Sequence, residues 1–188
     1  MNKQKPKKGE YAYPMYERKR VILRTILYFG ISIAVFVLGW ASTKTKDNLL
    51  TIVAVLGLLP SSKSLVSVIM YLRIPQFSQA FYKEISENIK TVPAIYSMYL
   101  TSYKKNFPVN CFAVRSGNLI GFTEFDICDA DACEKHIKEM LNQNAIKGVT
   151  VKIFKERQKF EDRAVQLEAL EPSGREEEIL TLLCDISL

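Results

Sequence analysis

The chain of 188 residues contains little of the chemistry from which most active sites are built. It has one histidine, His136, so a catalytic or metal-binding histidine could only be that residue. Four cysteines are present at positions 111, 128, 133 and 184. The spacing of Cys128, Cys133 and His136 is unlike that of a zinc site, and no second Cys/His pair exists to complete one. We therefore expect no metal and no cofactor.

Glycine-rich phosphate loops and catalytic Ser/His/Asp or Cys/His sets are also missing. Residues 57–64 (GLLPSSKS) partly match a phosphate-binding loop, but Ser62 replaces its second glycine. The segment lies in an apolar run with no strand before it, which is the wrong context for cradling a phosphate. The chain shows no internal repeat either. With no catalytic residue to name, we expect a protein that is not an enzyme.

Long apolar runs, by contrast, are prominent. Residues 21–41 (VILRTILYFGISIAVFVLGWA) carry one charge, Arg24, close enough to the start of the run to snorkel. About 20 helical residues rise about 30 Å, which matches the hydrocarbon core of a bilayer. A cleaved signal peptide is the alternative, but the run is too long and a second one follows. The sequence predicts a retained membrane span.

The second run, residues 49–72, follows a polar link at residues 42–48 and is interrupted by Pro60, Ser61, Ser62, Lys63 and Ser64. Neither half is long enough to span alone. We expect one helix that continues through Pro60, with neighbouring serine hydroxyls satisfying freed carbonyls. The two runs then form a transmembrane hairpin, residues 21–73.

The basic residues indicate the orientation of this hairpin. Seven lysines and arginines precede the first run, whereas the link holds only Lys44 and Lys46. The positive-inside rule then places both chain ends in the cytoplasm of what resembles a two-span bacterial membrane protein. The cysteines would lie in that reducing compartment, where we expect no disulfide.

Polar residues in the second run form the first candidate site. Lys63 lies ten residues before Arg73, or about 15 Å from that end of the helix. A lysine at that depth favours a partner or a wet cavity, so it could contact an ion, a lipid or another subunit. The alternative is a snorkelling lysine beside a broken helix. The candidate residues are Lys63, Ser61, Ser62 and Ser64.

The basic N-terminal tail, residues 1–20, is the second candidate site. Its low aliphatic content argues against a folded unit. It could bind anionic lipid headgroups or act only as a topology signal. The lipid-facing candidates are Lys3, Lys5, Lys7, Lys8, Arg18, Lys19 and Arg20.

Residues 76–188 predict one small cytosolic domain. They hold 14 Lys and Arg against 17 Asp and Glu, which gives no support for nucleic-acid binding. Apolar periodicity predicts a helix after Pro75, strands at 94–101, 108–115 and 119–125, a helix capped by Asp131, a strand near 149–153, and two further helices. Ser173 and Glu176 indicate a capping box before the last helix. The order α-β-β-β-α-β-α-α describes a mixed α/β domain in a single layer.

The α-β-β-β-α-β part of this order resembles the core of restriction-endonuclease-like nucleases, over roughly residues 77–170. That resemblance implies an acidic residue on the second strand and an E-x-K on the third, which hold Mg²⁺ and activate water. The second strand, PVNCFAVR, has no acid, and Glu124 is followed by Phe125 and Asp126 rather than by a lysine. These departures indicate an inactive relative at most.

Three functional hypotheses follow. The first is a membrane-anchored domain that binds another protein or has a regulatory role at the inner membrane face. The second is an accessory subunit of a membrane complex that works through the polar kink around Lys63. The third is a divergent, inactive nuclease-like domain. The expected partners are the lipid bilayer, anionic headgroups and another protein.

Overall fold

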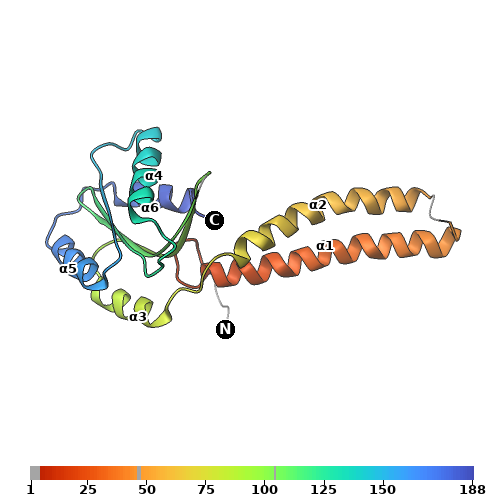
Figure 1. Cartoon of the computed structure of the whole chain (residues 1–188), viewed down its shortest axis with the longest axis horizontal. Helices are drawn as coiled ribbons and strands as arrows, with labels where there is room; N and C mark the ends of the chain where they lie inside the picture. The colour runs from red at the N-terminus through yellow and green to blue at the C-terminus, as the bar shows by residue number, and fades with distance from the viewer. Residues whose placement is uncertain (1–4, 46–47, 104) are drawn as a thin grey trace. The chain divides into compact units, whose positions relative to one another are not determined.

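The computed structural model describes residues 5–45, 48–103 and 105–188. It divides into two units, one made of residues 14–74 and the other of residues 1–13 with 75–188. The first unit is a pair of long helices, and the second is an α/β domain (Figure 1).

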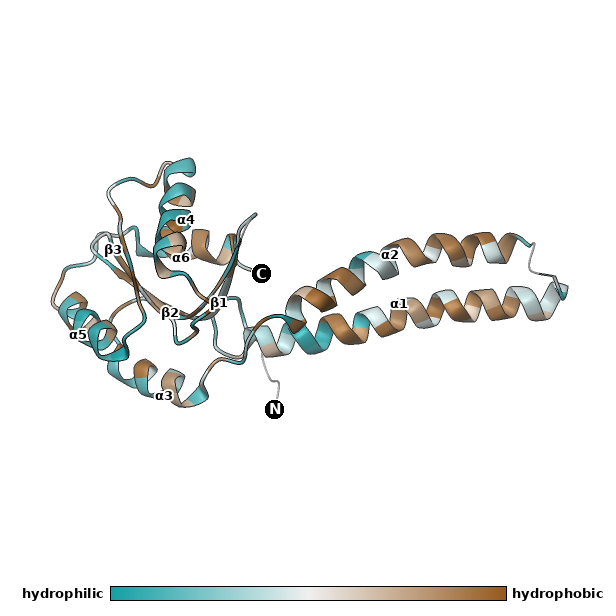
Figure 2. Ribbon diagram, in the orientation of Figure 1, coloured by the Kyte–Doolittle hydropathy of each residue, from teal (hydrophilic) through white to brown (hydrophobic). Residues whose placement is uncertain are grey.

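The helical unit contains α1 (Tyr13–Thr43) and α2 (Leu49–Leu72), both long and apolar enough to cross a membrane. The expected second run coincides with α2, and α2 does continue through Pro60. Helix α1 begins eight residues before the first apolar run, so its first two turns carry the basic residues. Asn48 caps α2, since its side chain accepts a hydrogen bond from the Thr51 amide. Figure 2 shows the largely hydrophobic colouring of both helices.

The α/β domain follows the predicted order of elements. It consists of α3 (Gln79–Asn88), β1 (Ala94–Thr101), β2 (Asn106–Arg115), β3 (Asn118–Phe122), α4 (Ala130–Gln143), β4 (Thr150–Phe154), α5 (Arg157–Glu168) and α6 (Glu176–Asp185). The sheet order is β1-β2-β3-β4. Strands β1 to β3 are antiparallel neighbours, and β4 joins β3 in parallel through the α4 crossover.

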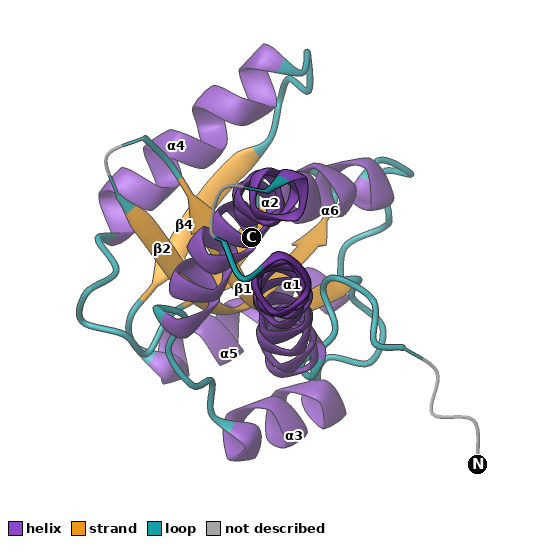
Figure 3. Cartoon of the chain, turned by 90° about the vertical axis from the view of Figure 1, so that its right-hand side faces the viewer, coloured by secondary structure: helices purple, strands orange, loops and turns teal. Residues whose placement is uncertain are grey.

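Helices cover both faces of this sheet, so the single layer expected from the sequence is wrong. Apolar side chains of α4 and α6 pack on one face around Phe112 and Leu119. Those of α3 and α5 pack on the other face around Phe122 and Phe160. Figure 3 shows the strands between these helices. The domain is a three-layer α/β/α sandwich with two small cores.

The cap of α4 also differs from the prediction. Asp129, rather than Asp131, accepts a hydrogen bond from the Ala132 amide and caps the helix. Glu134, three residues after Asp131 and so in position for a capping box with it, instead accepts from the Ile153 amide of β4 and pairs with Lys152 at 3.0 Å. A tertiary contact to the edge strand has therefore replaced the local one.

Candidate functional site

Helices α1 and α2 meet along a seam of small and hydroxyl residues. The hydroxyls of Thr25 and Ser64 lie 2.6 Å apart. A Cβ atom added to Gly57 would lie 2.7 Å from the Ser32 hydroxyl. One added to Gly39 would lie 2.8 Å from the Leu50 Cβ. Each step of seven residues along α1 matches a step of seven back along α2, so the antiparallel register is constant from one end of the pair to the other.

The large apolar residues of these helices point away from this seam. Leu23, Ile26 and Leu59 are each more than 60% exposed, while Thr25, Ser61 and Ser64 are buried. Among the described residues, all the exposed large hydrophobics except Tyr103, Ile127, Val165 and Leu170 lie on α1 and α2. This is the reverse of a coiled coil in water, whose seam is built from large apolar side chains.

The predicted polar residues of α2 are divided between two faces. Ser61 and Ser64 are buried in the seam, whereas Ser62 and Lys63 are exposed. The Ser61 and Ser62 hydroxyls donate to the carbonyls of Gly57 and Leu58, one turn back. Residues 57–64 are helical throughout, which rules out a phosphate loop there.

The basic residues proposed to face lipid are spread over both units. Lys3 lies outside the described residues. Lys5 and Lys7 are exposed, but Lys8 donates to the Ser187 carbonyl at 2.7 Å. The remaining three lie on α1, where Arg20 pairs with Glu17; they are Arg18, Lys19 and Arg20.

Residues 7–13 are packed on the α/β domain, contrary to the expectation of an unfolded tail. The Gly9 carbonyl accepts a 2.7 Å hydrogen bond from the Tyr96 amide of edge strand β1. Tyr11 stacks on Tyr82 at 4.6 Å and donates to the Phe77 carbonyl. Near the other end of β1, the C-terminal residues bond to Tyr99 and Thr101. Both ends of the chain therefore cover the exposed edge of β1, which could otherwise pair with a strand of another molecule.

The structure does bring together the two strands on which the nuclease resemblance depends. The Asn110 amide donates to the Glu124 carboxylate at 2.6 Å, and the Glu124 backbone amide donates back to Asn110. The Ser78 amide also donates to this carboxylate. An amide thus occupies the place where the chemistry needs a second acid, and Glu124 is tied into structural hydrogen bonds.

Opposite Asn110, Ser97 lies in β1 with a φ of 54°. Its buried hydroxyl has no hydrogen-bond partner among the described residues. Because no described side chain is hydrogen-bonded to this hydroxyl, the strained position carries no catalytic assignment.

Cys128, Cys133 and His136 lie just before α4 and in its first two turns. Within the described residues, no group of three or more His, Cys, Asp or Glu side chains could hold a metal ion. A hydrogen bond from Cys133 lowers the pKa of Cys128 and raises that of Cys133. His136 packs on Phe107 at 5.8 Å. These three residues are part of the packing between α4 and the sheet.

Hollows open on the part of the domain surface that the structure describes. A groove of about 490 Å³ lies between the β1–β2 turn and α4, and includes Tyr103, Lys105, Phe107, Lys135 and His136. Tyr103 is fully exposed beside it. Glu139 also lines the groove, and Lys105 pairs with Asp129 at 2.7 Å, so the groove offers an aromatic surface of mixed charge.

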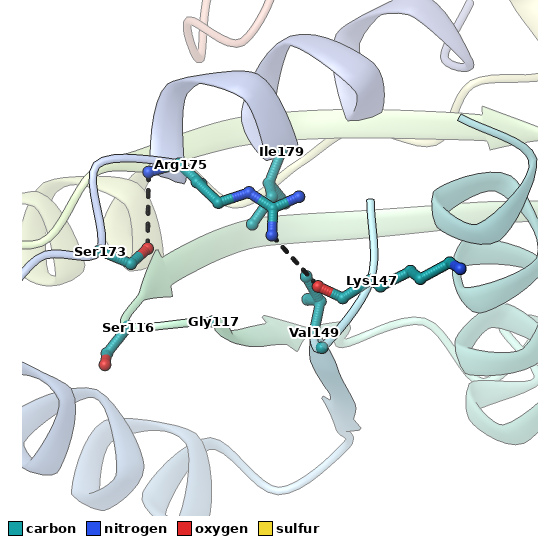
Figure 4. Close-up of a pocket in the computed structure, with 8 residues that line it drawn as sticks. Ser116, Gly117, Lys147, Val149, Ser173, Arg175 and Ile179 are labelled. Carbon is teal, nitrogen blue, oxygen red and sulfur yellow. Dashed lines mark hydrogen bonds between the residues drawn. The ribbon is translucent and has the colours of Figure 1, made fainter. Parts of the chain in front are cut away.

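The second hollow, of about 200 Å³, lies at the start of α6. Figure 4 shows the Arg175 guanidinium bonded to the Lys147 carbonyl, while the Lys147 ammonium points away from the other lining residues. The neighbouring Glu176 is buried and accepts hydrogen bonds from the amides of Ser116 and Ser173. Burial alone would raise the pKa of Glu176, but these hydrogen bonds lower it to about 2. Glu176 ties the β2–β3 turn to α6, a structural role.

Comparison of the chain with family models, curated proteins and solved structures gives no significant match to any of them.

The residues that matter most in the hairpin were not among the sequence candidates. Thr25, Ser32 and Gly39 on α1 recur every seven residues, and Gly57 and Ser64 on α2 repeat that spacing. This recurrence of small residues inside apolar runs is a readable signal of close helix packing in membranes.

Proposed function

We propose that this chain is an integral membrane protein whose hairpin anchors the α/β domain at the inner face of the membrane. The domain acts there as a protein-interaction or regulatory module. The observation that carries the anchoring is the inverted seam between α1 and α2.

Lipid is the solvent that favours such a seam. In water, covering a large apolar side chain stabilises a fold by about 1.5–3 kcal/mol, so a soluble pair would turn those residues inward. In a bilayer the lipid tails already cover them, and helices instead associate through small residues and interhelical hydrogen bonds. The Thr25–Ser64 bond and the contact at Gly57 are of this kind.

A soluble core helix is the competing explanation for two apolar helices. Such a helix would be mostly buried inside its protein. In the most apolar window of each helix, however, only 17% of the residues are buried. The low burial supports insertion, and the excess of lysine and arginine before the first run supports cytoplasmic chain ends.

The interaction role is supported by the surface of the domain rather than by any catalytic set. The groove beside Tyr103 combines an exposed aromatic side chain with side chains of both charges. Tyrosine side chains of this kind are common anchors at protein interfaces. Two alternatives remain proposals. One is an accessory subunit using the polar kink at Lys63, and the other is an inactive nuclease-like domain with Asn110 in place of an acid.

A crosslinking experiment on the full-length protein in cells tests the interaction role. A photoreactive amino acid replaces Tyr103 in the groove or, as a control, Val165, which is 62% exposed on α5. A protein trapped from position 103 and not from 165 is the expected result. Trapping of no protein from position 103 would contradict the interaction role. Crosslinking from position 63 tests the subunit alternative, which predicts a protein rather than lipid alone.

A further inference from the structure

We propose that Arg24 and Lys63 together form a binding site for the phosphate of an anionic phospholipid on one face of the hairpin. This inference rests on the proposed membrane insertion and assigns a ligand to it. Neither residue was paired with the other on sequence grounds, because they are 39 positions apart in the chain.

The seam places these two residues at nearly the same depth along the helix pair. Arg24 immediately precedes Thr25, and Lys63 immediately precedes Ser64, whose hydroxyls are hydrogen-bonded to each other. Along the helix axes, Arg24 and Lys63 are therefore separated by only about two residue rises, or about 3 Å. Both side chains are exposed.

The antiparallel arrangement also places them on the same face. Two antiparallel helices that share a regular seam are related by a two-fold axis normal to the plane that contains them. Positions that precede the seam by one residue on each helix are equivalent under that axis, so they lie on the same side of the pair. With helix axes about 8–10 Å apart, both long side chains can reach one phosphate.

The chemistry around the two cations fits a phospholipid. Tyr28 lies one turn beyond Arg24 on the same side of α1 and offers a hydroxyl near the interface. Exposed apolar side chains flank the site three or four residues from Arg24 or Lys63, namely Leu27, Leu59 and Val66. A lipid headgroup could bind the cations while its acyl chains cover these residues. In the described part of the two helices the only acidic residue is Glu17, which pairs with Arg20.

The same register lowers the free-energy cost of placing Lys63 within an apolar helix. Measured along α2, it lies about 15 Å from Arg73. Measured along α1, the neighbouring Thr25 lies only four residues, or about 6 Å, inside the apolar run that begins at Val21. Arg24 and Lys63 can therefore meet a phosphate at the headgroup boundary by snorkelling.

Native mass spectrometry of the full-length protein tests the site. The protein is released from bilayers of phosphatidylcholine and phosphatidylglycerol, and the lipid that it retains is counted. The R24Q/K63Q variant is compared with K44Q/K46Q, which removes the same charge from the hairpin link without touching positions next to the Thr25–Ser64 bond. A parallel sample with excess inorganic phosphate distinguishes a lipid from a free phosphate as the ligand.

The wild type should retain phosphatidylglycerol in preference to phosphatidylcholine. R24Q/K63Q should bind it at least about tenfold more weakly, as expected from losing charge-assisted hydrogen bonds to a phosphate. The control variant should lose much less affinity for phosphatidylglycerol, and inorganic phosphate should not displace the lipid. Equal losses in both variants, no lipid preference, or displacement by inorganic phosphate would overturn the site.

The same bilayers separate this inference from the proposed insertion. Lipid quenching of Trp40 fluorescence reports insertion independently of the lipid retained. Quenching without a preference for phosphatidylglycerol contradicts only the Arg24–Lys63 site. Absence of quenching contradicts the insertion itself.

Discussion

The hydroxyls of Thr25 and Ser64 lie 2.6 Å apart across the two helices, whereas those of Ser32, Ser61 and Ser62 donate back to carbonyls of their own helix. Thr25 also donates to the Val21 carbonyl at 2.8 Å, so Ser64 is left as the donor in the interhelical bond. This contact fixes which residues of α1 and α2 lie at equal depth. The proposed lipid site depends on it directly.

Close approach at Gly57 should be essential for this pairing. Gly57→Leu would force a side chain into Ser32, whereas Gly30→Leu places the same side chain where no atom lies within 4 Å of the added Cβ. Overpacking of this kind typically costs about 1–3 kcal/mol. Disulfide formation between cysteines introduced at positions 25 and 64 measures the pairing. It should fall in the Gly57 variant and persist in the Gly30 control. Equal crosslinking in both would contradict the seam.

Glu176 should make the stability of the α/β domain depend on pH. Its folded pKa of about 2 lies below the ordinary value of 4.5. Its stabilising contribution is therefore fully present above about pH 4.5 and is lost as the pH falls toward 2. Glu176→Gln should destabilise the domain at neutral pH by about 1–2 kcal/mol, because the amide replaces a carboxylate that accepts several hydrogen bonds.

Amide hydrogen exchange near Ser116 and along α6 measures this effect. Glu178→Gln is the matched control, since it removes the same charge from the same helix but from a half-exposed side chain paired with Arg175 at 3.4 Å. The control should change exchange little. A Glu176→Gln variant with unchanged exchange at pH 7 would show that the hydrogen-bonded carboxylate does not hold the turn to α6.

Gly9 should be required for the N-terminal segment to dock on β1. It has a φ of +93°, and an added Cβ would lie 2.8 Å from Ile95. Gly174 has a φ of +78° but open space around it, so Gly174→Ala measures backbone strain alone. Left-handed backbone costs an alanine about 1–2 kcal/mol at either site. Only Gly9→Ala should also speed amide exchange at Tyr96. Equal effects at Tyr96 from both variants would contradict the packing.

Much of the fold could be predicted because local patterns decide it. Helix α2 and strand β1 have the predicted bounds, since the long apolar run and the Tyr-rich extended segment each favour one structure. The cap of α4 could not be predicted in this way, because Asp129 and Asp131 are both plausible N-cap residues. The choice depends on Glu134, which is engaged by Ile153, nineteen residues away.

The N-terminal segment shows a second limit. Its low aliphatic content is typical of an unfolded tail. In the structure, however, Tyr11 stacks on Tyr82, and the Gly9 carbonyl accepts a hydrogen bond from an amide of the edge strand β1. Neither contact leaves a local pattern. The seven-residue spacing of Thr25, Ser32 and Gly39 does predict the seam. It does so only when small residues, rather than large ones, are taken to mark the contact between the helices.

Fluorescence of Trp40 tests the central claim most directly. It is the only tryptophan of the chain and is 54% exposed on α1, near the hairpin link. In bilayers that contain brominated lipids, the account predicts strong quenching, greater for bromines near the headgroups than for bromines at the bilayer centre. Quenching no stronger than that of a water-exposed tryptophan would contradict membrane insertion of the hairpin.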